Sequence, residues 1–152
     1  MGTIRSATKR DVPELQRLDS EAFPDIPMTS TYFYESIGFA AVDILVSEAP
    51  QDKLAGFISL FQNQRADSTL QIGSLAIDEK MRAQGLGGKL IEASIKLAIQ
   101  EKFKVFELVV WPGNAKAISL YKNMGFEVKS TIENYYGDGN QRYQMQLDLE
   151  AG

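Results

Sequence analysis

The strongest constraint on the fold is an apolar run in the second half of the chain, KVFELVVW at residues 104–111. A strand with apolar side chains on both of its sides has to be covered on both faces. Such a strand belongs in the centre of a sheet that has helices packed against it. We therefore expect an α/β or α+β protein whose sheet is covered by helices.

Strand-like and helix-like segments alternate along the rest of the sequence. The expected strands are residues 2–7, 41–49, 53–64, 68–78, 104–111, 126–136 and 142–150. The expected helices are residues 8–22, 29–39, 84–102 and 114–124. Thr8 and Asn114 are suitable helix caps, and Gly125 is a suitable end for the last helix. Residues 50–52 predict a hairpin turn, and Gly73 predicts an irregularity in the fourth strand.

Length and composition narrow the class of protein. The chain has 152 residues and no repeat or linker, so we expect a single domain over residues 1–152. It contains no Cys and no His, which excludes disulfides, Cys/His zinc sites and Ser-His-Asp catalysis. We expect no metal. No apolar run approaches the roughly 18 residues that span a bilayer, and no signal region opens the chain. A cytoplasmic location away from membranes is therefore expected.

The charges are distributed unevenly. Residues 11–48 contain eight acidic residues and one basic residue, Arg17. Residues 80–129 contain nine basic and four acidic residues. This asymmetry indicates either two ligands of opposite charge or an ordinary solvated surface. A nucleic-acid partner is disfavoured because the sequence pI is about 4.9.

Residues 82–90, RAQGLGGKL, join an expected strand to an expected helix. A glycine-rich turn before a helix is typical of anion sites, because free backbone N–H groups and the helix dipole both favour negative charge. The P-loop and dinucleotide patterns do not fit, since Ala83 and Leu90 stand where those patterns need other residues. The remaining pattern, R-x-x-G-x-G, fits a phosphate loop and a flexible helix start equally well.

Three longer motifs resemble the GNAT superfamily of acyl-CoA-dependent N-acyltransferases. They are SLAIDEKMRAQGLGGKLI, ELVVWPGNAKAISLYKNMGFE and ENYYGDGNQRYQMQLDL. The third is similar to the RimI-like branch, whose members acetylate the N-terminal alanine of ribosomal proteins. The resemblance covers nearly the whole chain in element order. It implies the GNAT fold, a mixed and largely antiparallel sheet flanked by helices, and acetyl-CoA as the acyl donor.

The resemblance also implies which residues would hold acetyl-CoA. Backbone groups of the fourth strand would pair with the pantetheine arm, at Leu75, Ala76 and Ile77. Amides of the loop would take the pyrophosphate, at Arg82, Ala83, Gln84, Gly85, Leu86, Gly87 and Gly88. Asn114 would contact the donor near the thioester. Asn114 as a helix cap and nothing more remains an alternative.

Two residues are implied for the chemistry. Tyr121 matches the family tyrosine that protonates the departing thiolate, although it also has the position of a packing residue. RimI-like enzymes carry a base at the position of Val109, so this chain departs from the pattern there. Glu107 shares the strand face of Val109 and could act through water. It could equally be a charge at the start of the strand.

The missing strong base bears on the acceptor. At pH 7 an α-amine is roughly 10% free base, whereas a lysine amine is about 0.04% free base. A site with one doubtful base therefore favours the α-amine of a protein N-terminus. A small amine, such as a polyamine, an amino acid or an antibiotic, is the first alternative. A non-catalytic CoA-binding domain is the second, because it would need no base.

Five residues are candidates for binding the acceptor. The resemblance implies acceptor-binding segments in the acidic N-terminal half and near the last turn. The candidates there are Tyr32, Tyr34, Glu35, Tyr135 and Tyr136. The tyrosines could equally belong to the core. Exposed edge strands of the expected sheet would permit a homodimer.

Overall fold

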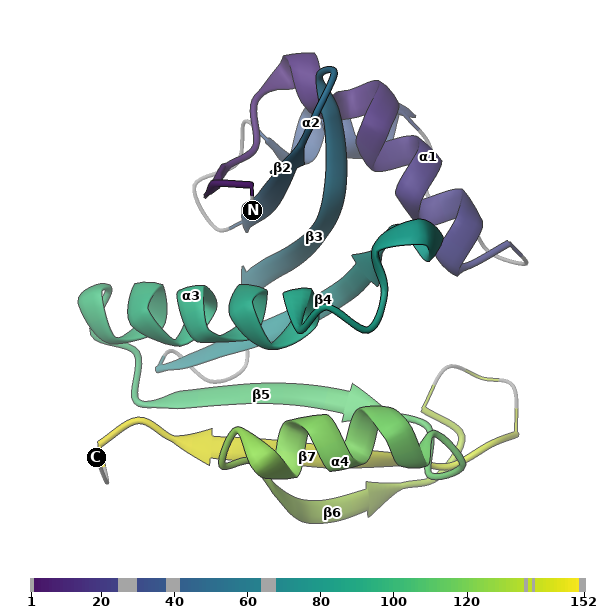
Figure 1. Cartoon of the computed structure of the whole chain (residues 1–152). Helices are drawn as coiled ribbons and strands as arrows, with labels where there is room; N and C mark the ends of the chain where they lie inside the picture. Colours follow the sequence, from purple (N-terminus) through teal and green to yellow (C-terminus); the bar gives the residue numbers. More distant parts are fainter. Residues whose placement is uncertain are drawn as a thin grey trace. The chain divides into compact units, whose positions relative to one another are not determined.

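A computed structural model describes residues 2–24, 30–37, 42–63, 68–135, 137 and 139–150. The strands are β1 (Ile4–Ser6), β2 (Val42–Ala49), β3 (Lys53–Gln62), β4 (Thr69–Ile77), β5 (Val105–Val110), β6 (Glu127–Ile132) and β7 (Arg142–Asp148) (Figure 1). The helices are α1 (Val12–Ala22), α2 (Ser30–Ser36), α3 (Leu86–Gln100) and α4 (Ala115–Asn123). Two short 3-10 turns lie at Lys9–Asp11 and Glu79–Met81. The order of elements expected from the sequence is confirmed.

The strands form one mixed sheet in the order β1-β2-β3-β4-β5-β7-β6. The pairs β1–β2, β2–β3, β5–β7 and β6–β7 are antiparallel. β4 and β5 are parallel, with Thr69–Gln71 opposite Val105–Glu107. The described chain divides into a first unit, Met1–Phe61 with Gly73–Ser94, and a second unit, Gln62–Ile72 with Ile95–Gly152. The expected fold class is confirmed.

The first unit has an apolar core between its helices and its strands. Leu15 and Leu18 of α1 and Phe33 of α2 are buried with Val46 of β2 and Phe57 of β3. The rings of Phe33 and Phe57 meet edge to face, with centroids 5.7 Å apart. Each such side chain contributes about 1.5–3 kcal/mol when fully buried. This packing fixes α1 and α2 on β2 and β3.

The hairpin in the first unit turns where the sequence predicts. Gln51 and Asp52 both have positive φ, 64° and 60°. Positive φ at both central residues defines the type I′ turn, whose twist matches that of paired strands. The amide of Lys53 closes the turn by donating to the carbonyl of Pro50.

The second unit packs α4 against β5 through aromatic rings. Phe126 lies between Tyr121 of α4 and Phe106 of β5, with ring centroids 5.8 and 5.6 Å apart. In Figure 1, α4 is drawn over β7 and runs nearly along the direction of that strand. Gly125 has φ of 104°, and the amide of Phe126 returns to the carbonyl of Tyr121. These two features end the helix at the glycine expected from the sequence.

Several element boundaries differ from the sequence expectation by one or more residues. The sixth strand ends at Ile132, because Asn134 has φ of 50° and accepts the amides of Gly137 and Gly139. α3 begins at Leu86 rather than residue 84, since Gly85 has φ of 74°. The first helix begins as a 3-10 turn and becomes α-helical only from Val12.

One side chain of the apolar run is not in the core. Trp111 follows the end of β5 and is 57% exposed, although the rest of the run is mostly buried. Its ring occupies the space that a side chain at Gly113 would need. No helix in the described part of the chain is long and apolar enough to cross a membrane.

Candidate active site

The loop between β4 and α3 combines strain with an open helix start. Ala83 and Gly85 both have left-handed φ, 66° and 74°. This conformation costs an alanine about 1–2 kcal/mol. Such strain persists where the surrounding structure needs it, often at binding sites. Arg82 fastens the loop to the end of β4, because its Nε donates to the carbonyl of Ile77 at 3.2 Å.

The first turn of α3 presents backbone donors. The first intrahelical hydrogen bond runs from Lys89 N to Gly85 O, 3.2 Å apart. The amides of Leu86, Gly87 and Gly88 precede it and have no acceptor within the helix. Leu86 is buried and anchors the turn, whereas residues 82–85 are exposed. This arrangement can bind an anion through backbone N–H groups and the helix dipole.

The end of β4 lies directly before this loop. Ala76 is buried in the core against α1 and α2, while Leu75 and Ile77 are half-buried. The amide of Ser74 donates to Ser59 Oγ at 2.9 Å. β4 is continuous from Thr69 to Ile77, and the irregularity expected at Gly73 stays a prediction. The parallel ladder between β4 and β5 is recorded for Thr69–Gln71, well before Leu75.

The acidic residues of the first unit are largely engaged by two arginines. Within 3.3 Å of Arg5 or Arg17 lie Asp11, Glu14, Glu21 and Glu48. These are half of the eight acids in residues 11–48. Half of the acidic residues in this segment thus form ion pairs with arginines of the same unit, so their charges are not available to a cationic ligand.

The arginine contacts change the ionisation of these acids. Hydrogen bonds from Arg5 hold the pKa of Asp11 below its ordinary value. Hydrogen bonds from Arg17 lower the pKa of Glu14, which also accepts the Leu54 amide at 2.9 Å. Burial alone would raise the pKa of Asp78, but the Lys80 amide and Arg17 lower it.

In the second unit, Asn114 caps α4. Its Oδ1 accepts the amide of Ala117 at 3.2 Å, and the residue is exposed. The capping role expected from the sequence is therefore confirmed. The side-chain NH₂ group takes no part in the cap and can still meet a ligand. Trp111 lies at the other end of the same short turn, because the amide of Asn114 donates to its carbonyl.

Tyr121 is a buried phenol. It is 8% exposed and packs on Phe126, so the packing role considered from the sequence is present. Burial raises its pKa, so the phenol stays protonated at neutral pH. Among the described residues its hydroxyl has no recorded hydrogen-bond partner. A protonated phenol with a free donor is suited to general-acid chemistry.

Glu107 is a buried carboxylate, 4% exposed, on the opposite face of β5. Side chains alternate along a strand, and Phe106 faces α4, so Glu107 faces away from it. Its Oε1 accepts the side-chain amides of Gln144 and Gln146 at 2.9 and 2.8 Å. Its Oε2 accepts Asn63 Nδ2 at 3.4 Å. The two predicted catalytic residues thus lie on different faces of the second unit's sheet.

The candidate acceptor residues are mostly at the surface. Tyr32 and Tyr34 are 42% and 52% exposed, Glu35 is exposed, and Tyr135 is 39% exposed. Lys9 Nζ lies 4.5 Å from the centroid of the Tyr34 ring. The neighbouring Phe33 belongs to the core instead. Tyr136 lies outside the described residues.

Comparison with known proteins decides the family. The model of the Acetyltransferase (GNAT) family matches residues 10–126. An N-alpha-acetyltransferase of Sulfurisphaera tokodaii is 30% identical over 157 residues, which span 96% of this chain and 92% of that protein. The chain belongs to the acetyltransferase (GNAT) family.

Solved structures agree on the GNAT fold. The ribosomal-protein-S18-alanine N-acetyltransferase of Escherichia coli superposes with a TM-score of 0.83 at 24% identity, covering 98% of this chain and 94% of that chain. Arabidopsis thaliana NAA60, solved in complex with acetyl-CoA, superposes with a TM-score of 0.86 at 19% identity and covers 99% of both chains. These identities support the fold alone.

Sequence reasoning missed the side chains that hold Glu107. Gln144 and Gln146 alternate on β7, and Asn63 follows β3. The Q-x-Q pattern was visible in the sequence and predicts two amides on one strand face. The register that brings them to Glu107 was not visible, because it joins residues 37 and 39 positions apart.

Proposed function

We propose that this GNAT protein transfers an acetyl group from acetyl-CoA to the α-amine of a protein N-terminus by direct attack. The observation that carries the proposal is the row of amides at Leu86, Gly87 and Gly88, which have no acceptor within α3. Family membership supports the acetyl-transfer chemistry. The relative from Sulfurisphaera tokodaii, an N-alpha-acetyltransferase, favours an N-terminal amine over a small molecule.

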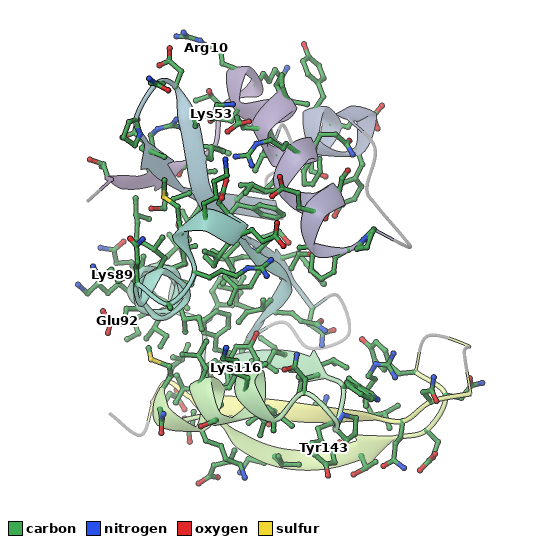
Figure 2. The ribbon with its side chains drawn as sticks, turned by 45° about the vertical axis from the view of Figure 1, so that its right-hand side comes forward. Arg10, Lys53, Lys89, Glu92, Lys116 and Tyr143 are labelled. Carbon is green, nitrogen blue, oxygen red and sulfur yellow. The ribbon has the colours of Figure 1, made fainter. Side chains whose placement is uncertain are left out.

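The residues of the first unit fit the donor. Amides of residues 82–88 would hold its pyrophosphate, with Lys89 on the first turn of α3 as a nearby charge (Figure 2). Backbone groups of Leu75, Ala76 and Ile77 would pair with its pantetheine arm as an added strand. Asn114 is also proposed to contact the donor, near the thioester. The donor supplies an activated acetyl group as a thioester.

Tyr121 is the proposed general acid. Its raised pKa keeps the phenol protonated at neutral pH. A thiol has a pKa near 8.5, so its thiolate is already a fair leaving group. The acid is therefore expected to contribute roughly 10²-fold, the low end of the usual range. The chain has no Cys, so no cysteine can carry the acetyl group.

Glu107 is the proposed base, and it acts through water. Its carboxylate is 4% exposed, so direct contact with a peptide amine is disfavoured. An N-terminal α-amine needs little help, because roughly 10% of it is already free base at pH 7. Tyr32, Tyr34, Glu35 and Tyr135 are the proposed contacts of the peptide, and Tyr136 remains a sequence-based candidate. A cytoplasmic location, a homodimer and the absence of a nucleic-acid partner also remain predictions.

The test is product formation with acceptors of two classes. The protein is incubated with acetyl-CoA and either a panel of short peptides or a panel of small amines. We expect peptides with free N-termini to gain the mass of one acetyl group, and the same peptides with blocked N-termini to stay unchanged. Acetylation of small amines alone would contradict the proposed acceptor. Tight CoA binding without any product would contradict the activity.

A further inference from the structure

The carboxylate of Glu107 accepts hydrogen bonds from neutral side-chain amides and forms no ion pair among the described residues. Among the described residues, no Lys or Arg lies within ion-pair distance of its carboxylate. Each oxygen of a buried carboxylate needs hydrogen-bond donors, and here neutral side-chain amides supply them. An apolar residue would suit the same position on β5 better if packing were the sole requirement. A buried acidic side chain at this position is therefore a candidate for a role beyond packing.

The partners of Glu107 are unequal on its two oxygens. Oε1 accepts two amide donors, from Gln144 at 2.9 Å and from Gln146 at 2.8 Å. Oε2 accepts one long contact, from Asn63 at 3.4 Å. A carboxylate oxygen has two lone pairs in its plane, so Oε1 is fully used. Oε2 keeps the capacity to accept a further proton donor.

Strand pairing explains why both glutamines reach the same atom. Gln146 lies opposite Glu107, and Gln144 lies opposite Val109, in the antiparallel ladder of β5 and β7. Their side chains therefore share one face of the sheet with Glu107. Ser130 of β6 donates its hydroxyl to Gln144 Oε1 at 2.8 Å. This contact turns the NH₂ end of Gln144 toward the carboxylate.

We propose that Gln144 and Gln146 are positioning residues, which fix Glu107 Oε1 so that Oε2 receives the proton of the acceptor amine. The inference rests on the proposed function and names residues that act through Glu107. As the amine nitrogen bonds to the acetyl carbon, its proton passes through one water molecule to Oε2. The C–S bond breaks, and the sulfur leaves with the proton of Tyr121. Solvent then restores both side chains.

The test is a double-mutant cycle on kcat. Gln144→Leu with Gln146→Leu removes both donors and keeps the side-chain volume similar. We expect kcat to fall roughly 10-fold to 100-fold, with KM for acetyl-CoA unchanged. In a Glu107→Gln background, the same two changes should lower kcat no further, because the glutamines act only through the carboxylate.

Gln71, on the strand β4 next to Glu107, offers a matched control. Gln71 lies opposite Glu107 in the parallel ladder of β4 and β5, yet no hydrogen bond to the carboxylate is recorded for it. Gln71→Leu should keep the wild-type kcat. If the double variant does not fold, the single variants each leave one donor on Oε1 and should show smaller losses of kcat.

The outcomes separate this inference from the proposed function. The positioning role would be overturned if the glutamine changes lowered kcat equally with and without Glu107. It would also be overturned if Glu107→Gln kept the wild-type kcat. Acetyl transfer would stand in both cases. No product from the wild-type protein with any peptide would overturn the proposed function and the inference with it. If the glutamine changes lower kcat in the protein that retains Glu107 and not in the Glu107→Gln variant, the result supports both proposals.

Discussion

Glu14 in the first unit and Glu107 in the second are both shielded carboxylates, but their partners differ in kind. Glu14 accepts two nitrogens of Arg17, at 2.7 and 2.8 Å. Glu107 accepts neutral amides only. A carboxylate neutralised by an arginine stabilises the fold and is poorly placed to take up a proton. Glu107 forms no ion pair among the described residues, which is compatible with the base role proposed for it.

The residues proposed for the reaction divide in a similar way. Those proposed to bind acetyl-CoA would offer mainly backbone groups, the amides of residues 86–88 and the end of β4. Those proposed for catalysis, Tyr121 and Glu107, would offer side chains. Changes in the loop should therefore weaken binding, and changes at Tyr121 or Glu107 should lower turnover.

The largest effect is expected from a charge in the loop. Gly85→Glu adds a negative charge and bulk where the amides would hold a pyrophosphate. Two like charges about 4 Å apart cost about 4 kcal/mol at an effective dielectric constant of 20. This energy corresponds to a roughly thousandfold weaker Kd for CoA. Calorimetry on the folded variant measures it.

Gly137→Glu is the control for the loop variant. Gly137 also has positive φ, 77°, and a side chain there would meet nothing within 4 Å. The control therefore carries the same backbone strain and the same added charge, far along the chain from the loop. It should bind CoA like the wild type. Equal weakening in both variants would remove the loop from the binding site.

The next effect concerns turnover. Tyr121→Phe removes the phenolic proton and leaves the ring to pack on Phe126. We expect kcat to fall roughly 10²-fold, while Kd for CoA stays unchanged. Steady-state kinetics with a peptide acceptor, together with calorimetry, measure the two quantities. Wild-type turnover would assign Tyr121 to packing alone.

A smaller effect is expected on stability. Arg17→Met keeps the aliphatic stem and removes the hydrogen bonds to Glu14, Asp78 and the carbonyl of Leu54. We expect the free energy of unfolding to fall by about 2 kcal/mol. Arg10→Met is the control, because Arg10 is exposed and takes part in no recorded ion pair of the described chain. Urea denaturation measures both variants. If Arg10→Met lowered the free energy of unfolding as much as Arg17→Met, the contacts of Arg17 would not explain the loss.

The smallest expected effect is a pH dependence of the stability that Arg17→Met removes. The folded-state pKa values of Glu14 and Asp78, which both accept hydrogen bonds from Arg17, are lowered. Their contribution to stability is present above the unfolded pKa, about 4, and is lost as pH falls through the folded values. The gap in unfolding free energy between wild type and Arg17→Met should therefore narrow below about pH 4. A gap that stays constant down to pH 2 would contradict the ion-pair assignment.

Local patterns predicted most of the fold. The apolar run at 104–111 gave the central strand, and the glycines after residue 84 gave the loop. Both depend on residues that are close in the sequence. The contact of Arg17 with Glu14 also has helical spacing and could have been expected. Its contact with Asp78, 61 positions away, could not.

Strand register, left-handed backbone conformations and the exposure of single side chains were harder to predict. Asn134 tolerates a left-handed conformation, but nothing in ENYYGDGN indicates that it would end the strand early. The exposure of Trp111 likewise contradicts the apolar pattern around it. For the candidate site, the sequence predicted Glu107 as a base that acts through water. Its amide partners became known only with the register of β5 and β7.

The central claim is that amides at the start of α3 hold the twin phosphates of the donor. Calorimetric titration with CoA and with pantetheine, which lacks the diphosphate and the nucleotide, tests it most directly. We predict measurable heat and saturable binding for CoA, and much weaker binding for pantetheine. No heat with millimolar CoA, or equal affinity for the two compounds, would contradict the account.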